Sequence, residues 1–315
     1  MSTLYSCKGA KVTEIQIKNF DVEKELQAFF ETHMVDLIGY QFIATEFSIE
    51  KYRFDSVAFD NETNSFVIVE YKRGKNESLV DQGFAYLKTL LDRKADFILA
   101  YNEKMQVSKT KKDFDWSQTR IAFVSPYFTK FQRDAAAFGG SRFELYEVTR
   151  YTDDLYYIDK IGLDSSVPKT FQFGHDDQAI PLVKSVEKEI PNYDLNYHFE
   201  KSNSNDFVKE VYDELKNRIT EKYPGIEENI TKTYISYKLG GKFNLVNLFF
   251  HKSMIEVVLN ARRGTITDPY KLTYDITGRK WSAQYALKVT EKTDLDEVMH
   301  LINLTFKASK YGDKK

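Results

Sequence analysis

Two apolar runs separated by a short polar turn stand out in the first third of the chain. Residues 53–60 read RFDSVAFD, and residues 65–72 read SFVIVEYK. This arrangement predicts a β-hairpin. Because side chains alternate along a strand, Glu70 and Lys72 share one face of the second strand and Tyr71 lies on the other. The apolar start of that strand is typical of a central, covered strand. Glu70 and Lys72 follow this apolar part, where the strand leaves the buried core.

Helical and extended patterns flank this hairpin. After Asp21, a candidate N-cap, apolar residues recur at helical spacing, and the helix is expected to end near Gly39. Ser78 is a candidate cap for a second amphipathic helix. The predicted order of elements is helix 21–38, strand 42–49, hairpin 53–72, helix 78–91 and strand 95–101.

The segments around this core have weaker patterns. Val12, Ile15 and Ile17 indicate a small strand or arm that packs on the main domain. The charged stretch 104–115 is typical of a loop or an irregular helix. Beyond it we expect a strand at 120–125, a helix at 129–138, and a hairpin or sheet-edge extension at 143–148 and 155–161.

The composition of the sequence changes after residue 162. Polar residues and three of the six prolines fall between there and residue 206, which indicates a linker. The rest predicts a smaller α+β domain, with helix 208–219, strands 233–239, 243–250, 254–260 and 281–289, and a last helix capped by Thr293. We therefore expect a domain at 1–162, a linker at 163–204 and a second domain at 205–315.

Composition limits the classes of function. The chain has 315 residues, of which 42% are hydrophobic, so it is globular and long enough for two domains. A net charge of -2 means that any nucleic-acid site is a local patch. The single cysteine, Cys7, excludes an internal disulfide. Because no apolar run is long enough to cross a bilayer, we expect a soluble, cytoplasmic protein with no membrane partner.

The end of the hairpin carries the candidate chemistry. Asp55 and Glu70 fall on adjacent strands at the rim of a core, where unpaired carboxylates are costly unless they bind something. Mg²⁺ prefers such oxygens, and the carbonyl of Tyr71 is placed to be a third ligand. Lys72 could polarise a water or hold a phosphate oxygen. The alternative is that Glu70 and Lys72 form a weak, solvated ion pair at a strand end.

These residues resemble the motif of the PD-(D/E)xK nuclease superfamily, in particular its NucS/RecB-like branch. The order of elements matches, and Phe54 stands where the literal motif has proline. Glu25 competes with Glu23 for the position of the helix glutamate, and we prefer Glu23 because it shares a face with Gln27. The matching positions are Glu23, Asp55, Glu70, Lys72, Gln82 and Tyr86.

The resemblance implies a fold and an activity. The fold is α/β, a restriction-endonuclease-like αβββαβ core with a mixed sheet, and the second domain resembles a small domain of unknown function often attached to such proteins. The activity is hydrolysis of DNA with Mg²⁺ or Mn²⁺, in DNA repair or defence. Asp55 and Glu70 would bind the metal with the Tyr71 carbonyl, Lys72 would assist the water, and Glu23 and Gln82 would support them.

Other features leave alternatives open. Basic residues near the site form either a phosphate track or ordinary solubilising charge; they are Arg53, Arg73, Lys75, Lys88 and Arg93, with Tyr86 beside them. Aromatic and basic residues of the second domain, Tyr234 and Tyr237 among them, are more typical of a core plus a surface than of a stacking face. The chain could also be a catalytically inactive nucleic-acid or protein-binding module, or a homodimer assembled through its second domain.

Overall fold

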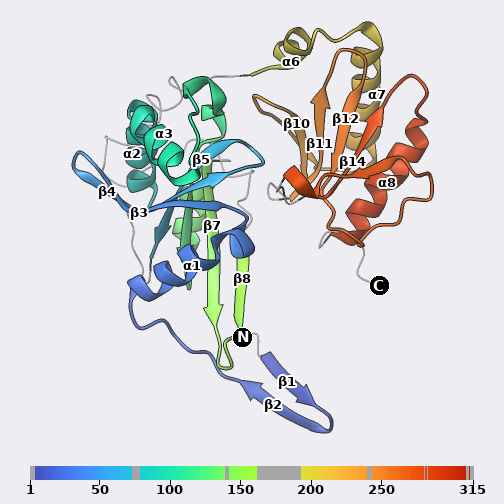
Figure 1. Ribbon diagram of the computed structural model, residues 1–315. Helices are drawn as coiled ribbons and strands as arrows, with labels where there is room; N and C mark the ends of the chain where they lie inside the picture. Colours follow the sequence, from blue (N-terminus) through green and yellow to red (C-terminus); the bar gives the residue numbers. More distant parts are fainter. Residues whose placement is uncertain are drawn as a thin grey trace. The chain divides into compact units, whose positions relative to one another are not determined.

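The computed structural model describes residues 4–72, 79–138, 142–161, 193–239, 243–279, 281, 283–309 and 312 (Figure 1). By their contacts they divide into two compact units, one within residues 1–189 and one within residues 190–315. The short segments Asn61–Ser65 and Phe114–Gln118 group with the second unit. The Asp55–Lys72 region, apart from its turn, belongs to the first unit.

The first unit is built on a mixed six-stranded sheet, which confirms the α/β class. Neighbouring β3 and β4 are antiparallel, β5, β6 and β7 run parallel to one another, and β8 is antiparallel to β7. The strands, in their order across the sheet, are β3 (Gln41–Ile49), β4 (Tyr52–Asp60), β5 (Ser65–Tyr71), β6 (Arg120–Ser125), β7 (Phe143–Arg150) and β8 (Tyr156–Ile161).

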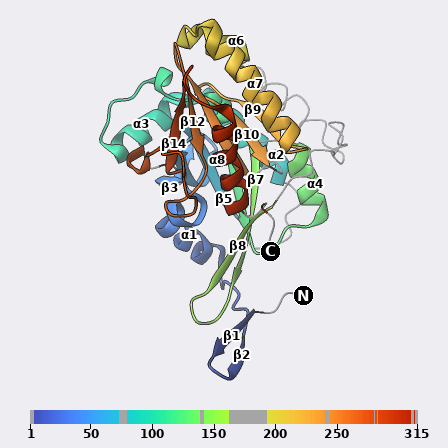
Figure 2. The same ribbon diagram turned by 90° about the vertical axis from the view of Figure 1, so that its right-hand side faces the viewer.

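Helices cover both faces of this sheet. Helix α1 (Glu23–Ile38) packs on the face that carries Val69 and Tyr71 of β5. Helices α2 (Leu79–Asp92), α3 (Lys94–Met105) and α4 (Lys130–Phe138) belong to the opposite face, and Figure 2 shows α4 beside β7. Both faces of β5 are therefore buried, as the apolar run in its sequence predicts.

Two predictions around these helices need correction. Residues 95–101 are not a strand but part of α3, which continues to Met105. Phe97 and Tyr101, one helical turn apart, are buried there, whereas Leu99 between them is 59% exposed. Helix α1 begins after Val22 rather than Asp21, and its N-cap makes no side-chain hydrogen bond; it ends at Gly39, as expected. The Ser78 cap lies outside the described residues.

The N-terminal segment forms a hairpin of its own. Strands β1 (Leu4–Lys8) and β2 (Lys11–Ile15) pair with each other and with no other strand of the described chain. Ile15 is buried, but Val12 and Ile17 are 61% and 60% exposed. The prediction that this arm packs on the main domain is therefore wrong except at its base.

The second unit is an antiparallel sheet with helices, which confirms the α+β prediction. Helix α6 (Leu195–Ser202), which precedes residue 205, groups with this unit. The strand order is β13 (Thr273–Asp275), β14 (Tyr285–Val289), β12 (Ile255–Leu259), β11 (Phe243–Phe250), β10 (Ile235–Leu239) and β9 (Glu227–Ile230), with helices α7 (Asp206–Lys222) and α8 (Leu295–Ala308).

Details of the second unit also differ from prediction. Its last strand begins at Tyr285 rather than residue 281, and α8 is capped by Asp294 rather than Thr293. Tyr234 and Tyr237 are 1% and 0% exposed, which favours the core interpretation of these aromatics over a stacking face. Within the described residues of both units, no helix is long and apolar enough to cross a membrane.

A glycine sets the distance between α2 and the sheet. A Cβ atom at Gly83 would lie 2.8 Å from Cζ of Phe143 and 3.2 Å from Cζ of Phe123. Both rings are buried in the strands below, so they have no free space into which to move. The absence of a side chain at residue 83 therefore lets α2, which carries the neighbouring Gln82, lie close to β6 and β7.

We predict that Gly83→Ala lowers the free energy of unfolding by about 1–3 kcal/mol, because the added methyl group overpacks this contact. Urea unfolding of the purified chain measures the change. Gly278→Ala is the matched control, since a Cβ atom there meets nothing within 4 Å. Equal stability of the two variants would contradict the close approach of α2.

Candidate active site

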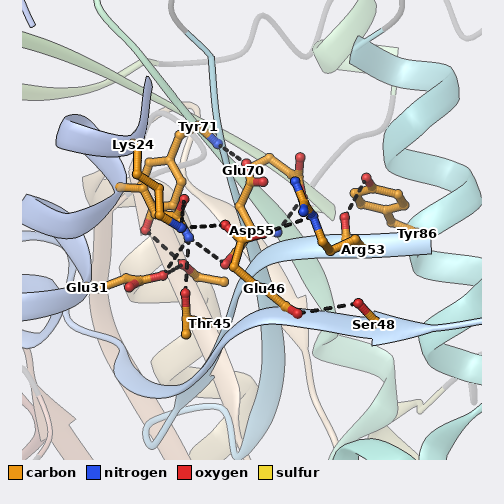
Figure 3. A network of polar contacts seen from close by, with 12 residues as sticks. Lys24, Glu31, Thr45, Glu46, Ser48, Arg53, Asp55, Glu70, Tyr71 and Tyr86 are labelled. Carbon is orange, nitrogen blue, oxygen red and sulfur yellow. Dashed lines mark hydrogen bonds and ion pairs between the residues drawn. The ribbon is translucent and has the colours of Figure 1, made fainter. Parts of the chain in front are cut away.

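Side-chain hydrogen bonds of Asp55 and Glu70 link β4 to β5 at the carboxyl end of β5. The backbone N–H of Asp55 donates to Oε1 of Glu70 at 3.1 Å, and the backbone N–H of Tyr71 donates to Oδ2 of Asp55 at 3.0 Å (Figure 3). Each carboxylate thus accepts a hydrogen bond from the backbone of the other's strand. The structure brings the two predicted acids together, with the backbone of Tyr71 beside them.

The second oxygen of Glu70 faces two polar side chains. Lys72 Nζ lies 3.3 Å from Oε2, and Nε2 of Gln82 donates to the same oxygen at 3.2 Å. The side chain of Glu70 is 1% exposed and that of Lys72 is 15% exposed, so this is not the solvated ion pair of the alternative interpretation. Glu70 and Lys72 share one face of β5, as their alternation predicts, and Gln82 reaches that face from α2.

A short chain of hydrogen bonds continues from Gln82. Its Nε2 also donates to the hydroxyl of Tyr86 at 2.8 Å, and that hydroxyl donates to the carbonyl of Arg53 at 3.1 Å. Gln82 and Tyr86 are one helical turn apart on the same face of α2. Through them, this face contacts both Glu70 of β5 and the backbone at the start of β4. The ring of Tyr86 is 7% exposed and packs edge-on against Phe54. This arrangement fits a support role for Tyr86 better than a stacking role.

Burial disfavours the ionised form of both acids and so raises their pKa values. It raises the pKa of Glu70 from 4.5 to about 8, and the nearby negative charge of Asp55 adds to the effect. Burial also raises the pKa of Asp55, while the N–H of Tyr71 and the charge of Lys72 oppose that change. Two carboxylates and one ammonium leave the site short of positive charge, so a bound cation would stabilise the ionised form of both acids.

Sequence reasoning missed a second set of polar contacts, which reaches Asp55 from α1. Gln27 is 4% exposed, and its Nε2 donates to the carbonyl of Asp55 at 2.9 Å and to Oε1 of Glu31 at 2.8 Å. Lys24 donates to Oε1 of Gln27 at 3.3 Å and to Glu46 of β3 at 2.6 Å, as Figure 3 shows for Glu46. A buried glutamine at the edge of an apolar stripe was the available signal, because such an amide needs partners.

The two candidate glutamates of α1 differ in their surroundings. Glu25 forms an ion pair with Arg150 of β7. Glu23 is exposed, and its negative charge contributes to raising the pKa of Asp55. Glu23 therefore remains the better match to the helix position, and its role as a ligand remains a prediction.

The basic residues proposed for a phosphate track are mostly engaged in ion pairs. Arg53 lies 2.9 Å from Glu46, Arg93 lies 2.9 Å from Glu50, and Lys88 pairs with Asp92 one turn along α2. These pairs fit ordinary surface charge for Arg53, Lys88 and Arg93. Arg73 and Lys75 lie outside the described residues.

Comparisons with known proteins define the family. A family model described as a domain of unknown function (DUF5655) matches residues 198–309, within the second unit. A Haemophilus influenzae protein described as uncharacterized is 35% identical over 306 residues, which are 96% of this chain and 99% of that protein. This chain belongs to the same family as that protein. No solved structure matches the chain.

The donor set fits Mg²⁺ or Mn²⁺ better than a metal that requires an all-protein cage. Among the described residues, no group of three or more His, Cys, Asp and Glu side chains could hold a metal ion. Mg²⁺, however, usually keeps several waters and binds through one or two carboxylates plus substrate phosphates. Asp55 and Glu70 supply two such carboxylates, with the Tyr71 carbonyl as the remaining candidate.

The raised pKa of Glu70 predicts a pH-dependent stability in metal-free buffer. Folded Glu70 keeps its proton up to about pH 8, whereas an unfolded glutamate, with its ordinary pKa of 4.5, loses its proton at much lower pH. The folded state therefore binds more protons between these values, and stability falls as pH rises through them, by at most about 1.4 kcal/mol per pH unit from this group. Glu70→Gln removes this contribution, so its stability relative to the natural chain rises from pH 5 to pH 8. Urea unfolding of both chains in EDTA tests this prediction. Parallel pH profiles of stability for the natural chain and Glu70→Gln would contradict the raised pKa of Glu70.

Proposed function

We propose that this protein is a divalent-metal-dependent deoxyribonuclease of the PD-(D/E)xK type, acting in DNA repair or in defence against foreign DNA. The observation that carries the proposal is the convergence of Asp55, Glu70 and Lys72 at the carboxyl end of β5. Neighbouring carboxylates beside an ammonium suit phosphodiester hydrolysis, which needs an activated water and neutralised phosphate oxygens.

The fold supports this proposal. In chain order α1, β3, β4, β5, α2 and β6 follow the αβββαβ arrangement of restriction-endonuclease-like cores, with α3 inserted before β6. The mixed sheet has the antiparallel β3–β4 pair on one side and the parallel β5–β6 pair on the other. Asp55 on β4 and Glu70 on β5 stand where the motif of that superfamily has its acids.

Each polar residue has a separate task in the proposed reaction. Asp55 and Glu70 would hold the metal, which when bound would supply a Lewis acid for the phosphate and lower the pKa of a water. Lys72 places a positive charge 3.3 Å from Glu70, where it can offset the charge of a phosphate oxygen. Gln82 and Tyr86 fix the orientation of Glu70, and Gln27 fixes the backbone at Asp55.

A second candidate is a nucleic-acid-binding module without turnover. The observation that favours it is that both oxygens of Glu70 already accept hydrogen bonds from protein groups and that its pKa is raised to about 8. A glutamate that stays protonated near neutral pH binds a cation weakly, because the metal must displace the proton. This candidate predicts DNA binding that is independent of Mg²⁺ and Mn²⁺.

We predict that Asp55→Asn, Glu70→Gln and Lys72→Ala each reduce DNA cleavage by at least about 10²-fold, because each removes a charge at the reacting centre. Labelled single-stranded, duplex and branched DNA, with Mg²⁺ or Mn²⁺, provide the assay. Glu50→Gln is the matched control, because its ion pair with Arg93 is exposed.

DNA cleavage by Asp55→Asn at the wild-type rate would refute the assignment of the active site. A wild-type chain that binds every substrate and cleaves none would favour the second candidate.

A further inference from the structure

The hairpin of β1 and β2 forms an arm that is open to solvent on both faces. In residues 4–14 every side chain is exposed except Ser6, which is half-buried. The connection is the two-residue turn Gly9–Ala10, where Gly9 has a φ of 62° that a tight hairpin turn favours. A two-stranded ribbon of this kind is only marginally stable by itself, so a contact along its length would stabilise it.

One face of the arm carries a row of hydrogen-bond donors that ends in two positive charges. Lys8 lies directly opposite Lys11, and Ser6 lies directly opposite Thr13. Like charges placed opposite each other destabilise a hairpin. Neither lysine has an ion-pair partner among the residues that the structure describes, and Glu14 pairs across the arm with Tyr5, on the other face. The tip therefore favours an anionic partner.

The arm is fastened to the edge of the sheet that carries the candidate site. The N–H of Lys18 donates to the carbonyl of Arg150 at 2.9 Å, the N–H of Thr152 donates to Gln16 at 2.8 Å, and Ile17 forms an isolated bridge with Tyr151. Arg150 is the last residue of β7. Because β5, β6 and β7 are parallel, their carboxyl ends point the same way, and β7 runs five residues beyond Leu145, which is level with Glu70 in the sheet. Figure 1 shows the arm projecting from the β7–β8 end of the first unit.

We propose that the arm is a DNA-binding ribbon, in which Lys8 and Lys11, flanked by Ser6 and Thr13, contact phosphates of the DNA that enters the candidate site. A two-stranded β-ribbon is narrow enough to enter a groove of duplex DNA. Lysines that neutralise phosphates release counterions and give binding that depends on salt but not on sequence. The inference rests on the proposed function, because it takes DNA as the substrate of the neighbouring site.

The test measures DNA binding by fluorescence anisotropy in a Glu70→Gln background, over a range of salt concentrations. Lys8→Ala/Lys11→Ala is expected to weaken binding to unrelated duplexes alike. It is also expected to reduce the slope of log K against log salt by about 2 in magnitude, since two phosphate contacts are lost. Lys8→Arg/Lys11→Arg keeps both charges and should bind as the parent does.

The matched control is Lys104→Ala/Lys292→Ala, which removes two exposed lysines outside the arm. An arm variant with the same affinity and salt slope as this control overturns the proposal. So does a parent chain that sediments as a dimer and becomes a monomer on Val12→Ser, because the arm would then serve self-association. Binding and cleavage are separate readouts. If the wild-type chain cleaves no DNA but binding depends on the two lysines, the proposed nuclease activity is wrong and the proposed role of the arm stands. If the wild-type chain cleaves DNA but binding does not depend on the two lysines, the proposed role of the arm is wrong and the nuclease activity stands.

Discussion

The burial of Glu70 beside Asp55 is the constraint on which the rest of the site depends. A carboxylate that is 1% exposed loses its hydration, and a second acid nearby adds repulsion. The chain compensates only in part, with the N–H of Asp55, the ammonium of Lys72 and the amide of Gln82. The ionised form of Glu70 therefore stays disfavoured near neutral pH, unlike the exposed carboxylates of the surface ion pairs around it.

The scaffold holds this arrangement from both faces of the sheet. Helix α1 reaches the backbone of Asp55 through Gln27, whose own orientation is set by Lys24. Helix α2 reaches Glu70 through Gln82 from the opposite face, and Gly83 lets the helix lie close enough to do so. Strand β5 is buried along its whole length, and Asp55 lies within β4, so both acids sit on strands rather than on a loop.

The sequence predicts those parts of the molecule that short-range periodicity determines. The alternation around Glu70 and the spacing of apolar residues before Gly39 correctly predict β5 and α1. The prediction of a strand at 95–101 is wrong, because the short apolar run at 97–101 is compatible with a strand or with a buried helix. The contacts of Gln27 join α1, β3 and β4, so no local pattern reveals them, and the arm's exposure is likewise a tertiary property.

The proposed function requires that Asp55 and Glu70 bind one hard cation between them. Anomalous diffraction from crystals soaked in Mn²⁺ tests this most directly, because it locates the ion without reference to activity. We expect a single strong peak within bonding distance of carboxylate oxygens from both residues, and we expect it to disappear in Glu70→Gln crystals. Crystals that show no peak at this position, or a peak bound to only one of the two carboxylates, would contradict it.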